Sequence, residues 1–429
     1  MLKKRFSSIF IPARNLFQKV KRQFYCISYL IIISSLFACS LAFPGRATNQ
    51  PSIQTTKPSL SPTITSIATS SPTVTAAVTP LPSPPPAPIP VTVSVETISA
   101  PSLKANLLNE PDDQAIRIYL PPSYPYSNLR YPVVYFLPGF GSASDGSEDF
   151  FPIKDLTSLM SNGQIKEVII VVPNGSNVLH GSFYVNSPVT GNWEDFITKD
   201  VVGYIDSNYR TIQAPEGRGI AGHSMGGFGA FNLAMRHPDI FGASYSLSPT
   251  FFDQDGLANS LMFDKENKSF KFLEIQNYLA TLPDKVAIAK MTKYEGAPGF
   301  TLAYGAAFAP NPDKGPPFFD YPLENINGRL LTIKPVWSLW QNGLGDWREK
   351  IAQYNANLIS LHGIVIDYGS DDSLQWIPVG SEYLSKQLTK AGIPNVIYKF
   401  KGGHSDKIHE RLFTVMLPFF SNVLMSPYK

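Results

Sequence analysis

The stretch "RGIAGHSMGGFGAFNLAMRH", residues 218–237, decides the fold. A short apolar run precedes Ser224 and an amphipathic run follows it, so the serine lies between a predicted strand and a predicted helix. Gly222 and Gly226 complete the pattern G-x-S-x-G, in which a sharp strand-to-helix turn lifts a serine above a sheet. The pattern also occurs in structural turns, so a nucleophilic role for Ser224 requires a base, an acid and an oxyanion site elsewhere in the chain.

Strand-like and helix-like patterns alternate on both sides of this turn. The predicted strands are residues 115–121, 131–138, 167–173, 218–222, 241–249, 362–369 and 395–400. The predicted helices are residues 193–209, 225–237, 379–392 and a C-terminal segment from about Ser405. Several of the strands are continuous apolar, β-branched runs, which favour burial on both faces. The alternation predicts an α/β fold with a mostly parallel sheet covered by helices on both faces.

Residues 251–359 interrupt this alternation. The segment is rich in proline, glycine and aromatic residues, as in "GAPGFTLAYGAAFAPNPDKGPPFFDYP". It follows the strand after the Ser224 helix, and its position corresponds to the carboxyl edge of the sheet, where open α/β sheets bind ligands. We therefore predict a cap-like insertion that shapes the substrate pocket.

The N-terminus has the composition of an export signal, predicted for residues 1–43. A basic region to Arg22 is followed by the apolar run 24–43, which ends in small residues. A single membrane anchor is the alternative, because the run approaches the roughly 20 residues that span a bilayer. "LFAC", residues 36–39, resembles a lipoprotein cleavage box with Cys39 as the lipidation site, whereas cleavage after Ala42 would give a secreted protein.

Residues 44–92 are predicted to form a disordered linker before a catalytic domain at 93–429. Eleven prolines between Pro51 and Pro90, among Ser, Thr, Ala and Val, are typical of an extended spacer. Both cysteines precede the linker, which excludes disulfides and thiol chemistry from the domain. Nine of the 36 basic residues but no acidic residue precede Glu96, so the domain is mildly acidic. A basic patch for nucleic acid is therefore not expected.

A nucleophilic serine needs a general base. His404, in "FKGGHSD", follows a predicted strand in a glycine-rich loop and is the preferred candidate, with His180 second. The chain has six histidines: His180, His223, His237, His362, His404 and His409. His223 lies in the turn itself, where its ring is expected to point away from the Ser224 hydroxyl.

The acid that orients the imidazole is expected in "IVIDYGSDDSLQW". Asp367 is predicted to lie within the strand, whereas Asp371 and Asp372 follow it at the sheet's carboxyl edge. The order Ser224, Asp372, His404 is the α/β-hydrolase order. Asp371 remains an alternative to Asp372.

An oxyanion site needs two preorganised backbone N–H donors. One is expected from Met225, at the start of the helix after the serine. The other is expected from Phe140, in the loop "YFLPGFGSASDG" after an early buried strand, where glycines allow the backbone to approach a substrate.

Seven motifs together resemble the "Putative esterase" family of α/β-hydrolases over about residues 100–424. They are "RIYLPPSYP", "YPVVYFLPGFG", "IIVVPNG", "FITKDVVGYIDSNYRT", "RGIAGHSMGGFGA", "YGSDDSL" and "GGHS". The family includes esterase D (S-formylglutathione hydrolase), feruloyl esterases, enterochelin esterases and mycolyltransferases. The resemblance implies Ser224 as nucleophile, Asp372 as acid, His404 as base and the amides of Phe140 and Met225 as oxyanion donors. This sequence departs from the family pattern at Pro138-Gly139, where members of the family often have a His-Gly pair.

The expected function is that of an exported serine carboxylesterase that acts through an acyl-enzyme and needs no metal or cofactor. Acyl transfer of the mycolyltransferase type uses the same intermediate, and a non-catalytic surface-binding module is the alternative from another class. The expected partner is a small-molecule or polysaccharide ester. Contact with a membrane is expected only through the N-terminal segment or its lipid. Tyr184, Trp193 and Trp376 are the aromatic candidates for substrate contact.

Overall fold

The computed structural model describes residues 88–426. The predicted export signal 1–43 with Cys39, and all but the last five residues of the predicted linker 44–92, lie outside the described residues. Between residues 88 and 426, no helix combines the length and the apolar character needed to cross a bilayer.

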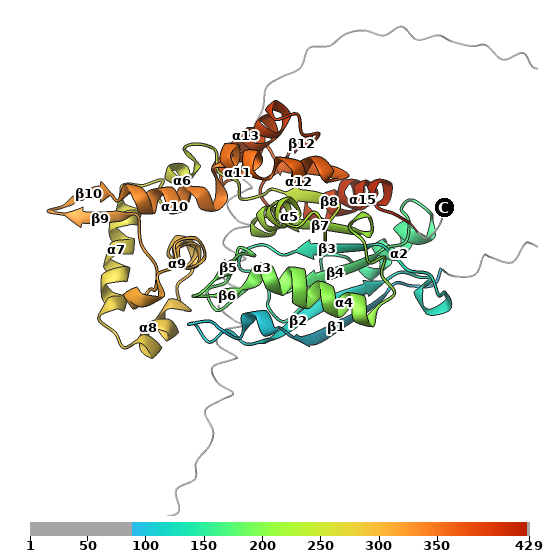
Figure 1. Cartoon of the computed structure of the whole chain (residues 1–429), viewed down its shortest axis with the longest axis horizontal. Helices are drawn as coiled ribbons and strands as arrows, with labels where there is room; N and C mark the ends of the chain where they lie inside the picture. Colours follow the sequence, from blue (N-terminus) through green and yellow to red (C-terminus); the bar gives the residue numbers. More distant parts are fainter. Residues whose placement is uncertain (1–87, 427–429) are drawn as a thin grey trace, which may run out of the picture. The chain divides into compact units, whose positions relative to one another are not determined.

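A sheet of eight strands forms the centre of the fold (Figure 1). In spatial order the strands are β1 (Thr92–Ser99), β2 (Asp113–Leu120), β4 (Ile169–Pro173), β3 (Val133–Leu137), β7 (Arg218–His223), β8 (Ala243–Leu247), β11 (Gly363–Gly369) and β12 (Val396–Phe400). β1 pairs antiparallel with β2, and β2 antiparallel with β4. All neighbours from β4 to β12 are parallel. The predicted fold class, a mostly parallel sheet of the α/β-hydrolase type, is confirmed.

Apolar side chains on both faces explain why the central strands form. In β3 all five residues are buried, and they alternate between two hydrophobic clusters. Val133, Tyr135 and Leu137 face one cluster, and Val134 and Phe136 face the other. This period of two is what a strand buried on both sides requires.

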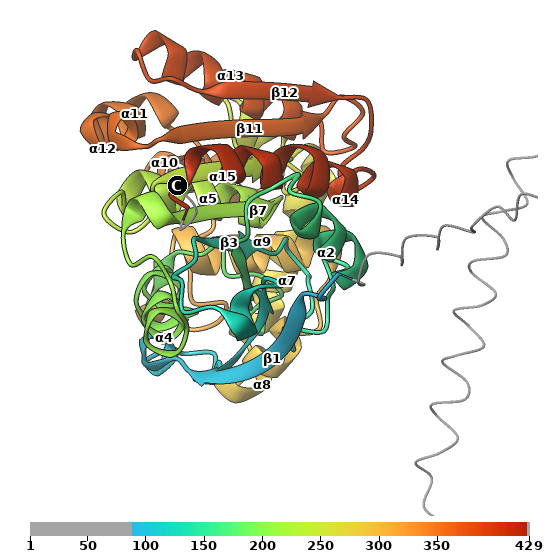
Figure 2. The ribbon, with the colours of Figure 1, turned by 90° about the vertical axis from the view of Figure 1, so that its right-hand side faces the viewer.

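Helices cover both faces of the sheet (Figures 1 and 2). The first cluster takes side chains from α3 (Trp193–Asp195), α4 (Val202–Asn208), α5 (Met225–Arg236) and α13 (Trp376–Lys390). The second takes side chains from α2 (Ile153–Ser161) and α15 (Leu417–Val423) and from the C-terminal turn after α14 (Ile408–Arg411). The predicted helix at 193–209 is present, with a wider helical turn at Phe196–Val201 between α3 and α4.

β1 is the main strand that the sequence pattern did not indicate. It is an edge strand, and only Ile98 on it is well buried, so it lacks the apolar run that identifies the central strands. The strand is instead stabilised by its backbone hydrogen bonds to β2.

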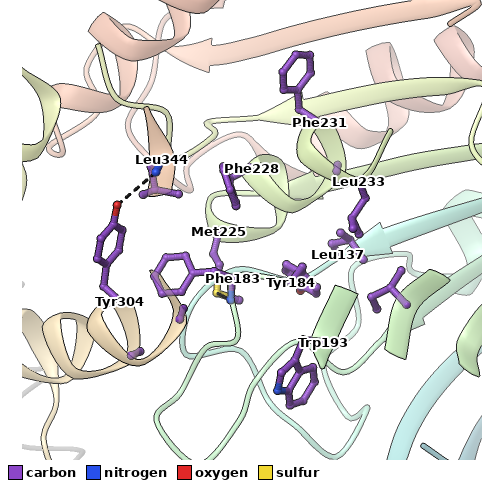
Figure 3. Packing of buried hydrophobic residues seen from close by; sticks show 14 of the residues in the cluster. Leu137, Phe183, Tyr184, Trp193, Met225, Phe228, Phe231, Leu233, Tyr304 and Leu344 are labelled. Carbon is purple, nitrogen blue, oxygen red and sulfur yellow. Dashed lines mark hydrogen bonds between the residues drawn. The ribbon is translucent and has the colours of Figure 1, made fainter. Parts of the chain in front are cut away.

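The segment 251–359 forms a largely helical insertion between β8 and β11 (Figure 1). It contains α6 (Gly256–Asn259), α7 (Glu266–Ala280), α8 (Asp284–Met291), α9 (Gly296–Phe308), the hairpin β9 (Leu323–Ile326) and β10 (Arg329–Thr332), α10 (Lys334–Leu344), α11 (Trp347–Gln353) and α12 (Asn355–Ser360). Tyr304 joins α9 to α10, because its hydroxyl accepts a hydrogen bond from the Leu344 amide at 3.2 Å (Figure 3). α9 packs onto the body of the fold through Phe300 and Phe308, which contact Phe183.

Candidate active site

Ser224 occupies the turn between β7 and α5 in a strained backbone conformation, with φ 58° and ψ −117°. Such a conformation is rare for a residue with a side chain and is typical of the nucleophile turn. The flanking glycines Gly222 and Gly226 are sterically required. A Cβ at Gly222 would lie 2.2 Å from the Gly226 carbonyl oxygen, and one at Gly226 would lie 1.9 Å from the Leu137 carbonyl oxygen.

His404 lies between Ser224 and Asp372 and bonds to both. Its Nε2 is 2.9 Å from Ser224 Oγ, and its Nδ1 is 2.6 Å from Asp372 Oδ2. A neutral imidazole whose Nδ1–H donates to the carboxylate leaves Nε2 free to accept the serine proton. Ser224 follows β7, Asp372 follows β11 and His404 follows β12, so the carboxyl ends of three parallel strands bring these residues together.

The two neighbouring aspartates have different environments. Asp372 is fully buried, and its Oδ1 accepts a hydrogen bond from the Leu374 amide at 2.8 Å. Asp371 is exposed and pairs with Lys401 at 2.8 Å. The contact with His404 is therefore made by Asp372.

Asp367 lies inside β11, as expected, and takes no part in this chain of hydrogen bonds. Its carboxylate is buried and accepts hydrogen bonds from Arg411 Nε, at 2.7 Å, and from the Tyr245 hydroxyl. It belongs to a buried structural pair beside the site.

The amides of Phe140 and Met225 lie in the two segments that flank Ser224. Met225 is the first residue of α5, so its N–H has no acceptor within the helix. In the part of the chain that the structure describes, neither amide has a hydrogen-bond acceptor. A Cβ at Gly139 would lie 3.5 Å from the Ser224 Cβ, which shows how closely the loop after β3 approaches the serine. The two unpaired donors are available to a developing oxyanion.

Comparison with models of known protein families identifies the family to which this chain belongs. The model of the family described as "Putative esterase" matches residues 110–420, most of the chain. This chain belongs to that esterase family. The resemblance predicted from the seven motifs is confirmed.

Two curated relatives and one solved structure are similar to this esterase-family chain. Esterase Rv1288 of Mycobacterium tuberculosis is 37% identical over 139 residues, 31% of this chain and 28% of the relative. The endo-1,4-beta-xylanase/feruloyl esterase of Xylanibacter ruminicola is 28% identical over 142 residues, 30% of this chain and 18% of the relative. The chain thus spans less than a third of the length of either relative. A solved ferulic acid esterase, 21% identical, matches 78% of this chain and 99% of its own, with a TM-score of 0.51, and shares the fold.

His223 connects the nucleophile turn of this esterase-family chain to the His404 loop. Its Nε2 lies 2.9 Å from the His404 backbone oxygen, and the two rings are 4.8 Å apart. Burial, and then repulsion from a charged His404, lower the pKa of His223 to about 4. Above that pH a neutral His223 donates its Nε2–H to the carbonyl. No sequence pattern indicated this contact, because it joins residues 181 positions apart.

The other histidines do not bond to Ser224. His180, the second candidate for the base, lies beside the loop that follows β3, where its carbonyl accepts a hydrogen bond from the Gly141 amide at 2.8 Å. His237 pairs with Glu194, and His409 with Asp155. Among the described residues, His404 alone is hydrogen bonded to the Ser224 side chain.

All three aromatic residues predicted to contact substrate belong to the core instead, which corrects that prediction. Tyr184 and Trp193 are fully buried (Figure 3). The Tyr184 hydroxyl donates to the Pro138 carbonyl at 2.8 Å, and the Trp193 indole N–H donates to the Thr190 carbonyl at 2.9 Å. Trp376 is also buried and packs against Phe252. Large aromatic side chains in this sequence fill the interior, and Tyr184 bonds to the loop that follows β3.

In residues 88–426, no three His, Cys, Asp or Glu side chains converge as a metal site. The arrangement around Ser224 consists of a hydroxyl, an imidazole, a carboxylate and backbone amides. Groups of these kinds carry out nucleophilic and acid–base chemistry in enzymes.

The tight glycine contacts lead to a stability prediction. In Gly226→Ala the added methyl meets backbone that cannot rotate away, so we expect the free energy of unfolding to fall by about 3 kcal/mol or more. Gly203→Ala is the matched control: it lies within α4 with no atom near its added Cβ, and it should stabilise the fold by about 0.5–1 kcal/mol. Urea unfolding followed by circular dichroism measures both, and equal effects would contradict this account of Gly226.

Proposed function

We propose that this chain is an exported serine carboxylesterase that hydrolyses ester bonds through an acyl-enzyme on Ser224. The observation that carries the proposal is the continuous chain of hydrogen bonds from Ser224 through His404 to the buried Asp372. The two unpaired amides beside Ser224 and membership of the esterase family support it. Export rests on the sequence of residues 1–43, with lipidation at Cys39 or release by cleavage after Ala42.

In the first half of the reaction, Ser224 Oγ attacks the carbonyl carbon of the ester while its proton passes to His404 Nε2. Asp372 stabilises the resulting imidazolium through its bond to Nδ1. The amides of Phe140 and Met225 donate to the oxyanion of the tetrahedral intermediate. The bond between the carbonyl carbon and the alcohol oxygen then breaks, and the alcohol leaves with the proton from His404.

In the second half, water attacks the acyl-enzyme as His404 removes one of its protons. The oxyanion of this second tetrahedral intermediate is bound by the same two amides. Its collapse breaks the bond to Ser224 Oγ. His404 returns the proton to the serine and the carboxylic acid departs. An alcohol in place of water would give acyl transfer, which product analysis with an added alcohol acceptor detects.

A fluorophosphonate probe tests the proposal directly, because it labels only an activated serine. Peptide mapping after labelling of the full chain should place the adduct on Ser224. The proposal fails if the folded protein takes up no probe, which is the outcome expected of a surface-binding module, or if the adduct lies on another residue.

We expect His223 to position His404. His223→Ala removes the donor to the His404 carbonyl, a loss of about 1–1.5 kcal/mol, so kcat on a short p-nitrophenyl ester should fall about tenfold with little change in KM. His223→Gln retains an amide donor at similar reach and should recover part of the rate. Thermal unfolding is measured alongside. A purely structural role would lower the unfolding temperature of both variants and leave kcat per folded molecule unchanged.

A further inference from the structure

A second cavity, separate from the triad, lies between the inserted helices and the body of the fold. Its volume is about 420 Å³, within the range of about 300–1,000 Å³ typical of small-molecule sites. Helices α9, α10 and α11 line one side, and β5 (Asn186–Ser187), α3 and α5 line the other. The residues used below are Glu194, Phe228, Asn232, Arg236, Phe308 and Lys350, all of which line it.

This cavity does not include the reacting groups. None of Ser224, His404, Asp372, Phe140 and Met225 lines it. Its residues on α5 are Phe228, Asn232 and Arg236, which lie four, eight and twelve positions after Ser224, so the cavity runs along the helix from roughly 6 to 18 Å beyond the serine.

Asn232 is a buried polar side chain that the fold itself does not explain. It is only 7% exposed and lies on α5 among Phe231, Leu233 and Ala234, where an apolar residue would pack without desolvating an amide. In residues 88–426, no protein group forms a hydrogen bond with its side chain. The amide faces this cavity and has no protein partner, so it is free to bond to a ligand that enters the cavity.

The charged groups around the cavity nearly cancel. Glu194 binds Arg236 Nε at 2.9 Å and His237 Nε2 at 2.7 Å, so its charge is compensated. Lys350 has no carboxylate partner among the described residues, and its Nζ donates to the Gly343 carbonyl at 3.0 Å. Burial lowers the pKa of Lys350 to about 7, so its charge is partly lost at neutral pH.

We propose that this cavity binds a neutral sugar of one or two rings. Each sugar hydroxyl both donates and accepts hydrogen bonds, and the cavity offers both kinds of partner: the Asn232 amide, the Glu194 carboxylate and the nitrogens of Arg236 and Lys350. Phe228 and Phe308 give it an apolar wall for the C–H groups of a ring. The near-neutral charge balance provides no large excess of positive charge to attract an acidic ligand. The site functions independently of Ser224.

Isothermal titration calorimetry on the full chain tests this assignment, with D-glucose, D-xylose and cellobiose as neutral probes and D-glucuronate as the charged comparison. We expect saturable binding of at least one neutral sugar. Asn232→Leu keeps the number and branching of the side-chain heavy atoms but removes the amide, and it should weaken that binding about tenfold. Lys350→Met should weaken it as well, while hydrolysis of a p-nitrophenyl ester changes less than twofold in both variants.

Two control variants separate this site from the proposed catalytic one. Asn208→Leu replaces an exposed asparagine at the end of α4 and should leave sugar binding unchanged. Ser224→Ala should bind the sugar as the parent does, so loss of esterase activity alone does not affect the proposal. Absence of saturable binding by all three neutral sugars, unchanged binding in folded Asn232→Leu, or tighter binding of glucuronate than of glucose would each overturn it.

Discussion

Replacement of Ser224 by alanine is expected to abolish ester hydrolysis while leaving the protein folded. The hydroxyl is the group that His404 Nε2 contacts at 2.9 Å, and alanine cannot form the acyl-enzyme. Removal of the nucleophile from such a triad lowers kcat by more than about 10,000-fold, and the remaining rate comes from the oxyanion donors and binding.

The measurement is the initial rate on a p-nitrophenyl ester, with fluorophosphonate labelling of the same preparations. Alanine should cause no steric conflict, because its side chain is smaller than that of serine, so the circular dichroism spectrum should match that of the parent. Turnover by Ser224→Ala within tenfold of the parent would rule out the proposed nucleophile.

The second large effect is expected at Asp372. Asp372→Asn preserves the shape of the buried side chain but removes the charge that holds Nδ1–H of His404. The imidazole then favours the tautomer whose Nε2 carries the proton and cannot accept one from Ser224. We expect kcat to fall about 10,000-fold.

Asp371→Asn is a matched control one residue away. That carboxylate is exposed and contacts Lys401 instead of His404, so the change should alter kcat less than about twofold. The same p-nitrophenyl assay measures both variants. Equal losses in the two, or a larger loss in Asp371→Asn, would show that the acid has been misassigned.

The sequence by itself determined the fold class and the segments that meet at the site. Short, continuous, β-branched apolar runs such as 131–138 and 167–173 favour strands covered on both faces, and the predicted strands and helices appear in the structure with small shifts at their ends. The G-x-S-x-G glycines were identifiable because the pattern itself is short and local, although the atom nearest to a Cβ at Gly226 belongs to the distant Leu137. Both features could be predicted because a short sequence pattern, or the hydrophobic character of a single segment, is enough to identify them.

Only the tertiary structure decided which side chains share an environment. Asp371 and Asp372 are adjacent and chemically identical, and their difference arises because the turn after β11 directs one towards Lys401 and the other into the interior. Tyr184 and Trp193 were plausible surface aromatics until packing placed them in the core. The hydrogen bond from His223 to the His404 carbonyl and the amide of Asn232 facing a cavity depend on contacts between distant segments. Such contacts depend on the packing of the whole chain. A local sequence pattern does not indicate which distant group a side chain will contact.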